Sequence, residues 1–178
     1  MTLDEVRRAV GHGVHRLMEK TVPGGDVAAN VQEFLRHHPS VVGPGTRALP
    51  EVSDVLSKLH AAGIRLAVCS NKPLELTQRI VQTQGWRPII DAVLGPESAG
   101  RPKPEPDMLL LALEQLGAAP EEALYVGDMA IDVETARNAG VRVWVLPTGS
   151  HTREQLIDSR PDRLLEHFSQ LQIGRAHV

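Results

Sequence analysis

The 178-residue sequence has a single cysteine and no apolar run that approaches the ~18 residues of a membrane-spanning helix. One cysteine excludes an internal disulfide, and the charged first ten residues do not resemble a signal peptide, so we expect a cytoplasmic protein. Cys69 lies inside an apolar stretch and is expected to be a small core residue. We expect no membrane partner.

No charge of one sign dominates. The 19 Lys and Arg and 22 Asp and Glu residues give a net charge of −3, with both signs mixed along the chain. This balance argues against a nucleic-acid-binding surface. An apolar fraction of 42% is ample for a core, and the length corresponds to one domain, or to one domain with a small insert.

The most informative stretch is LYVGDMAID, residues 124–132, in which an apolar run ends abruptly at Gly127-Asp128. Asp132 follows four residues later, at the start of a predicted helix. Open α/β sheets bind ligands at the carboxyl ends of their strands, and two carboxylates there can share a hard cation such as Mg²⁺. The alternative is that Asp128 is only a turn residue and Asp132 only a helix N-cap.

Two other stretches carry polar residues in comparable places. The apolar run 64–69 ends in Ser70-Asn71, and Lys103 lies between two prolines in the loop RPKPEP. Strand-like runs alternate with helical patterns from about residue 50 onward, which predicts an α/β fold, a Rossmann-like parallel sheet with helices on both faces. Right-handed crossovers place all the carboxyl strand ends at one edge, where these side chains should meet.

The rest of the chain divides by pattern. Residues 1–45 are all helical, with a Thr2-x-x-Glu5 capping box and a last helix over 26–37 that Pro39 is expected to stop. Residues 46–172 form the α/β core, and we expect its end, 153–171, to be one or two helices broken at Pro161. The last six residues, IGRAHV (173–178), continue no pattern and look like a translated sequencing adapter.

The order strand-Ser-Asn, Pro-flanked Lys, strand-Gly-Asp-x-x-x-Asp resembles the last three of the four motifs of the haloacid dehalogenase-like hydrolases. The resemblance covers roughly residues 2–171, and the strings SNKP, GRPKPEPDMLLLAL and YVGDMAIDVETARNAGV are most similar to the phosphoglycolate phosphatase branch. It implies Mg²⁺-dependent hydrolysis of a small phosphorylated metabolite by a monomer or homodimer. The helical opening resembles the cap that covers the site in this superfamily.

The resemblance also implies roles for individual residues. Ser70 and Lys103 would hold the phosphoryl group, and Asp128 would bind Mg²⁺. Asp132 would bind the ion through water or orient Lys103, and Asn71 would contact the substrate or brace its loop.

His12, in Gly11-His12-Gly13-Val14, corresponds to the substrate-facing turn of the cap in these relatives. A solvated turn residue is an equally good interpretation of this histidine.

One motif of the superfamily is missing. Its members open with an apolar strand ending in D-x-D-x-T, whose first Asp becomes an aspartyl-phosphate and whose second is the acid/base; no such string occurs here. The chain is therefore expected to be N-terminally truncated and inactive by itself, and its sheet to lack the central first strand. The strands at 64–69 and 123–126 would then flank a vacant position or be forced together.

Alternatives remain open. Phosphoryl transfer of the β-phosphoglucomutase type uses the same motifs with a different cap. A dehalogenase is less favoured because it needs no metal, which would leave the Gly-Asp-x-x-x-Asp pair idle. From another class, the chain is a catalytically inactive fragment or pseudoenzyme that can at most bind a ligand.

Overall fold

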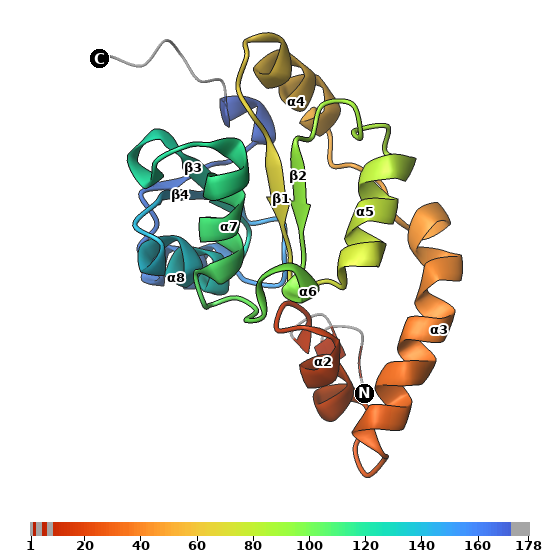
Figure 1. Ribbon diagram of the computed structural model, residues 1–178. Helices are drawn as coiled ribbons and strands as arrows, with labels where there is room; N and C mark the ends of the chain where they lie inside the picture. The colour runs from red at the N-terminus through yellow and green to blue at the C-terminus, as the bar shows by residue number, and fades with distance from the viewer. Residues whose placement is uncertain (1, 3–4, 7–8, 172–178) are drawn as a thin grey trace.

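The computed structural model describes residues 2, 5–6 and 9–171 and divides into a helical lobe and an α/β body (Figure 1). The lobe contains α2 and α3, drawn in red and orange beside the body. In chain order the elements are α2 (Val14–Thr21), α3 (Val27–Gly45), α4 (Val52–Ala61), β1 (Ala67–Cys69), α5 (Leu74–Thr83), β2 (Ala92–Leu94), α6 (Pro96–Ala99), α7 (Asp107–Leu116), η1 (Pro120–Glu122), β3 (Leu124–Gly127), α8 (Ala130–Asn138), β4 (Arg142–Val145), α9 (Arg153–Asp158), β5 (Arg163–Leu164) and η2 (Phe168–Leu171).

The strands form two parallel sheets. In the first, β1 pairs with β2 in a register that sets Ala67 opposite Ala92. In the second the order is β3-β4-β5, with Leu124 opposite Arg142. Helices α7 and α8 pack on one face of β3 and β4, and α4 and η2 pack on the other. The predicted α/β fold with a parallel arrangement and helices on both faces is confirmed.

No ladder joins β1 to β3 within the described residues. Every residue of both strands stays partly exposed, whereas Val143 and Val145 of β4 are 2% and 0% exposed. The two strands are therefore not forced together. Helix α7 packs against β1 and β2 and also contributes Leu109 and Leu113 to the apolar cluster around β4. Helix packing rather than strand pairing joins the two sheets.

The predicted closing helices are wrong in part, because β5 lies between α9 and η2. Asp162 holds this turn of chain against β4: its carboxylate accepts from the Val143 N–H at 2.7 Å, and its own N–H donates to the Val143 carbonyl at 2.9 Å. Leu165, just beyond, is fully buried. A strand of two residues is too short to show the alternation on which sequence reasoning depends.

Helix α3 corrects a second expectation, since it continues through Pro39 to Gly45. Proline removes one backbone hydrogen bond, but packing against α5 outweighs the loss, and Val42 beyond the proline is 4% exposed. The end of α3 lies beside the predicted boundary between residues 45 and 46, and the division into cap and core stays a prediction. The Thr2–Glu5 capping box is present, with the Thr2 N–H donating to Glu5 Oε2 at 2.6 Å.

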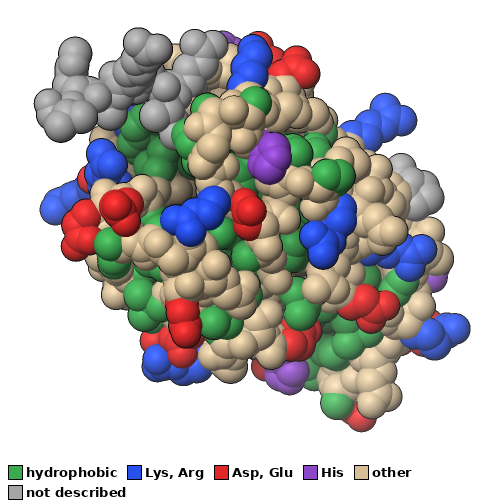
Figure 2. Space-filling model, turned by 45° about the horizontal axis from the view of Figure 1, so that its top comes forward, with side chains coloured by type: hydrophobic (Ala, Val, Ile, Leu, Met, Phe, Trp, Pro, Cys, Tyr) green, Lys and Arg blue, Asp and Glu red, His purple; other side chains and the backbone are tan. Residues whose placement is uncertain are grey.

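Acidic, basic and apolar side chains are interspersed over the described residues of the face in Figure 2. No helix of the described part is both long and apolar enough to cross a bilayer. Several positions of the first predicted helix, and the predicted adapter-like tail 173–178, lie outside the described residues.

Candidate active site

The sequence-predicted residues meet where the helical lobe touches the α/β body. Ser70, Lys103, Asp128 and Asp132 line one cavity of about 230 Å³. Ser70 follows β1 and Lys103 precedes α7. Asp128 follows β3, and Asp132 lies in the first turn of α8, so segments up to 62 positions apart converge. The lobe closes the cavity with mainly apolar side chains: Val10, Val14, Leu17 and Phe34. The structure therefore gives the geometry expected of one cleft beneath the opening helices.

A buried lysine is the centre of the polar network. Lys103 Nζ donates to Asp132 Oδ1 at 2.6 Å and to the Tyr125 hydroxyl at 3.1 Å, and the Lys103 and Asp132 side chains are only 11% and 4% exposed. Burial alone would lower the pKa of the Lys103 ammonium, but Tyr125 and Asp132 together outweigh it and hold that pKa above its ordinary value. Burial raises the pKa of Tyr125, so this residue is a neutral hydroxyl. The lysine is thus a fixed positive charge.

Asp132 is fully occupied within the protein. Its Oδ1 accepts from Lys103 and Tyr125, and its Oδ2 accepts from the backbone N–H groups of Asp128 and Met129 at 3.0 Å each. Gly127 permits this approach, because a Cβ there would lie 2.3 Å from the Asp132 Cβ. The geometry supports the role of orienting Lys103, and it also shows Asp132 capping the start of α8.

Asp128 is the carboxylate left for a ligand. In the described part of the chain it forms no ion pair with a side chain, and burial followed by the nearby Asp132 raises its pKa. Its Oδ2 lies against Gly149, where a Cβ would come within 2.4 Å. No group of three or more His, Cys, Asp or Glu side chains suited to a metal occurs among the described residues. Mg²⁺ needs only one or two protein carboxylates when water and substrate phosphate supply its other ligands, so Asp128 fits such an ion.

The loop after β1 carries the neutral and basic groups. The Ser70 hydroxyl oxygen accepts from the Lys72 N–H at 3.1 Å, which leaves its own hydrogen free to donate. Asn71 is 5% exposed and braces three segments. Its Nδ2 donates to the carbonyls of Gly11 and Lys103 at 3.0 Å each, and its Oδ1 accepts from the Lys103 N–H at 2.8 Å. Of the two roles expected for Asn71, the contacts support the brace.

The structure does not bring His12 into the cavity. Its side chain is exposed, while the glycines on either side, Gly11 and Gly13, do line the cavity with left-handed backbones at φ +116° and +88°. Burial, then the charges of Lys20 and Arg16, lower the pKa of His12. The turn presents backbone, not the imidazole, to the site.

Sequence reasoning missed two residues of this cavity region. Tyr125 was read only as part of an apolar strand, although a tyrosine hydroxyl in a buried strand needs a partner and could have drawn attention. Lys72 also lines the cavity, and its position directly after Ser70-Asn71 was the available signal.

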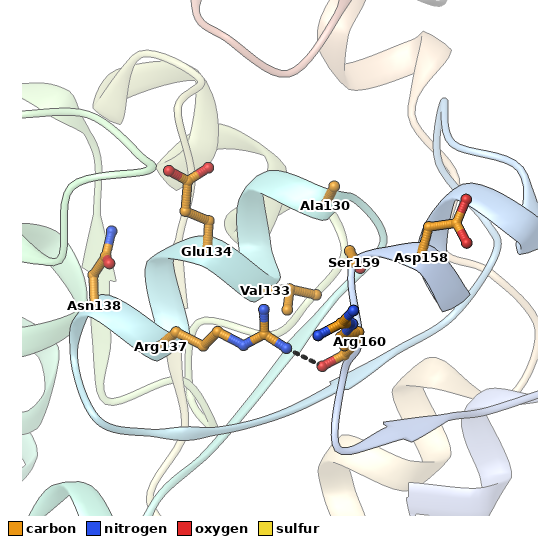
Figure 3. Close-up of a pocket in the computed structure, with 8 residues that line it drawn as sticks. All are labelled: Ala130, Val133, Glu134, Arg137, Asn138, Asp158, Ser159 and Arg160. Carbon is orange, nitrogen blue, oxygen red and sulfur yellow. Dashed lines mark hydrogen bonds between the residues drawn. The ribbon is translucent and has the colours of Figure 1, made fainter.

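A larger groove, of about 490 Å³, lies elsewhere, between α8 and the turn after α9 (Figure 3). Arg137 projects from α8 toward Arg160 and donates to its backbone carbonyl, which is a helix-end contact. Glu134 and Asp158 balance the two arginines, and the groove contains none of the predicted site residues. The smaller cavity is therefore the candidate active site, because it contains the predicted site residues and the larger groove does not.

The chain is similar in sequence to a known family and to individual members of it. The family model of haloacid dehalogenase-like hydrolases matches residues 1–146. Phosphoglycolate phosphatase of Psychrobacter arcticus is 32% identical over 180 aligned residues, covering 95% of this chain and 78% of that protein. Phosphoglycolate phosphatase of Aquifex aeolicus is 34% identical, with 78% of this chain and 65% of that protein covered. The chain thus spans less than two thirds of the second relative.

Solved structures agree. A predicted phosphoglycolate phosphatase from Haemophilus somnus superposes with a TM-score of 0.86 at 25% identity, covering 96% of this chain and 81% of the other. CbbY of Rhodobacter sphaeroides in complex with phosphate gives a TM-score of 0.80 at 25% identity, covering 94% and 78%. With a family model over most of its length and these relatives, the chain belongs to the haloacid dehalogenase-like hydrolases, in their phosphoglycolate phosphatase-like branch.

Proposed function

We propose that this protein has the site of a Mg²⁺-dependent phosphatase that hydrolyses small organic phosphomonoesters, similar to phosphoglycolate phosphatase. The observation that carries the proposal is the convergence of Ser70, Lys103 and Asp128 on one small cavity beneath the helical lobe. The relatives named above are phosphatases, and one related structure holds phosphate.

Two groups would hold the phosphoryl group. The Ser70 hydroxyl has a free hydrogen to donate, and the Lys103 ammonium has three donors, of which Tyr125 and Asp132 take two. The third can point at a phosphoryl oxygen. Because catalysis of phosphoryl transfer is mainly positioning and charge stabilisation, a lysine anchored by Asp132 is suited to this work.

Asp128 would hold the metal. Bound Mg²⁺ supplies positive charge that offsets the repulsion between an anionic nucleophile and an anionic substrate. Asp132, whose oxygens are already engaged, would act on the site by fixing Lys103 and the turn that carries Asp128.

The nucleophile would come from a D-x-D-x-T strand, which these 178 residues do not contain. Its first Asp would attack phosphorus to form an aspartyl-phosphate, while its second Asp gives a proton to the departing alkoxide. Water, giving a proton to the second Asp, would then release inorganic phosphate and regenerate the carboxylate. We therefore expect the 178 residues alone to bind phosphate and not to turn it over.

Transfer of the β-phosphoglucomutase type would use the same groups.

The test compares two proteins: the 178-residue chain and the same chain preceded by an added segment with a D-x-D-x-T strand and a following helix. Calorimetry should show phosphate binding to both, and p-nitrophenyl phosphate turnover, requiring Mg²⁺, only by the second. Asp128→Asn should remove the Mg²⁺-dependent rate, a loss on the order of 10³-fold, while Asp158→Asn, an exposed carboxylate on α9, should not. Turnover by the 178 residues at ~1–10³ per second would contradict the nucleophile assignment. A rate unaffected by Asp128→Asn would contradict the metal assignment.

A further inference from the structure

The hydroxyl group of Tyr125 meets three segments that surround the cavity. Its oxygen accepts from Lys103 Nζ at 3.1 Å, and it donates to Asp132 Oδ1 at 3.2 Å. It also lies 3.5 Å from the carbonyl oxygen of Cys69, the residue that precedes Ser70. Ser70 and Lys103 are the two residues proposed to hold the phosphoryl group, so one hydroxyl touches the segments that carry both.

Strand pairing does not fix these segments relative to one another. No ladder joins β1 to β3 among the described residues, and Lys103 lies in the loop before α7. The Tyr125 ring has a defined place, because it packs from β3 against the apolar cluster around β4. A hydroxyl on a ring held in this way is a rigid reference point for the flexible side chain of a lysine.

The ammonium group of Lys103 has three N–H donors. With Asp132 as the only acceptor, Nζ could rotate about the bond to its carbon and two donors would have no fixed direction. With Tyr125 as a second acceptor, two donors are engaged and the direction of the third is set. Burial raises the pKa of Tyr125, so the hydroxyl stays protonated and accepts from the lysine without adding a charge.

We propose that Tyr125 is a positioning residue of the phosphoryl site, whose hydroxyl directs the free N–H of Lys103 and holds the segment that carries Ser70. The inference rests on the proposed function, in which these two residues hold the phosphoryl group. The role of Tyr125 differs from that of Asp132, which supplies the charge that pairs with Lys103 at 2.6 Å. A phenylalanine would keep the packing of the ring, so the role belongs to the hydroxyl alone.

The alternative is that the hydroxyl is only a polar group that has found partners inside the protein. Such a group contributes to the free energy of unfolding and leaves the affinity of the folded protein for phosphate unchanged. Thr135 of α8 is a group of this kind, since it is 1% exposed and its hydroxyl donates to the Ile131 carbonyl at 2.7 Å. Thr135→Val removes one buried hydroxyl at nearly constant shape and is the matched control.

The first experiment measures binding of inorganic phosphate to the 178-residue chain by calorimetry. Because the loss of a hydrogen bond to a charged group releases the direction of Lys103, Tyr125→Phe should weaken phosphate binding by about 10-fold. Thr135→Val should bind phosphate as tightly as the unmodified chain does. Urea unfolding, followed by circular dichroism, gives the stability of each variant separately from its affinity.

The second experiment is spectroscopic and leaves every residue in place. Tyr125 is the one tyrosine of the sequence, so biosynthetic labelling with 3-fluorotyrosine gives a single ¹⁹F NMR resonance from this position. Phosphate bound by Lys103 changes the electric field at the hydroxyl. The resonance should therefore shift on titration with phosphate and saturate with the dissociation constant found by calorimetry, whereas chloride at equal ionic strength should give no saturating shift.

Each other outcome overturns a definite statement. A phosphate affinity that Tyr125→Phe leaves unchanged, or that Thr135→Val reduces equally, overturns the positioning role and leaves the phosphate site intact. A ¹⁹F resonance that does not respond to bound phosphate also overturns the positioning role, and this result does not depend on the folding of a variant. Failure of the unmodified chain to bind phosphate overturns the proposed function and this inference with it.

Discussion

The two sheets of the body carry opposite chemistry at their carboxyl ends. After the β1–β2 sheet come Ser70 and Lys72, whose hydroxyl and ammonium line the cavity. After the β3–β4–β5 sheet comes Asp128, whose carboxylate is left for a ligand, while both Asp132 oxygens are engaged within the protein. The first sheet and its loop are thus suited to anions (the anion half), and the second to a cation (the cation half).

The halves also differ in packing. β4 is buried by α7, α8 and α9, whereas β1, within the described residues, has a ladder on one side only and is partly exposed throughout. Near the site, polar contacts join the two halves. Lys103 Nζ donates to Asp132, and the Tyr125 hydroxyl lies 3.5 Å from the Cys69 carbonyl. The relative position of the anion half and the cation half therefore depends on a few polar contacts and on helix packing.

Lys103→Met should have the largest effect on this arrangement. It leaves the Asp132 carboxylate and the Tyr125 hydroxyl without their cation, and the removal of one partner from a buried ion pair costs ~3–5 kcal/mol. Urea unfolding monitored by circular dichroism should show the fall in the free energy of unfolding. The control is Lys58→Met, an exposed lysine, which should change it by less than about 0.5 kcal/mol. Equal, small effects of the two substitutions would show that the halves do not depend on this ion pair.

Much of this site was predictable because strand ends are visible in sequence. An apolar run that stops at Ser-Asn or Gly-Asp marks the end of a buried strand, and the parallel topology then brings Ser70 and Asp128 to one edge. Which oxygen of Asp132 binds which donor was not predictable, because that depends on the turn geometry that Gly127 allows. The exposed place of His12 agrees with one of its two interpretations, and the sequence alone did not decide between them because left-handed glycines set the direction of the turn.

The fold was predictable to the same extent. The alternation of strand-like runs and helical patterns predicted from about residue 50 onward is present, with α7 over residues 107–116 as one of its helices. The continuation of α3 past Pro39 and the existence of β5 depend on tertiary contacts, with α5 and with β4 respectively, which outweigh the local signals of proline and of a short segment.

Asn71→Ala should have an intermediate effect, on the contact between the anion half and the helical lobe. It leaves the Gly11 and Lys103 carbonyls and the Lys103 N–H without their partner, which should cost ~1–3 kcal/mol of unfolding free energy. Hydrogen exchange should accelerate in α2 and in the Lys103 loop. The matched control is Asn138→Ala, an exposed asparagine with one hydrogen bond to the Pro104 carbonyl in that loop. A comparable loss in both variants would contradict the bracing role of Asn71.

The smallest effect concerns Cys69 in the partly exposed strand β1. The reactivity of its thiol measures how well α7 covers this strand. Its thiol lies 3.7 Å from the Met108 carbonyl of α7, and burial, only partly opposed by Lys103, raises the pKa of Cys69 to about 11. Because only the thiolate reacts, a thiol with this pKa should react at pH 8 on the order of 100-fold more slowly than a free cysteine with a pKa of ~8.5.

The same shift has a defined sign for stability. The folded state favours the neutral thiol, so the contribution of Cys69 is fully present below ~8.5 and is lost as the pH rises through its folded pKa of about 11. We therefore expect slow modification by Ellman's reagent at pH 8, fast modification in urea, and a decline of unfolding free energy between pH 8.5 and 11 that is smaller in Cys69→Ala. Rapid reaction of the native thiol at pH 8 would mean that the edge of β1 is open to solvent, and that the two halves differ in packing even more than the described contacts indicate.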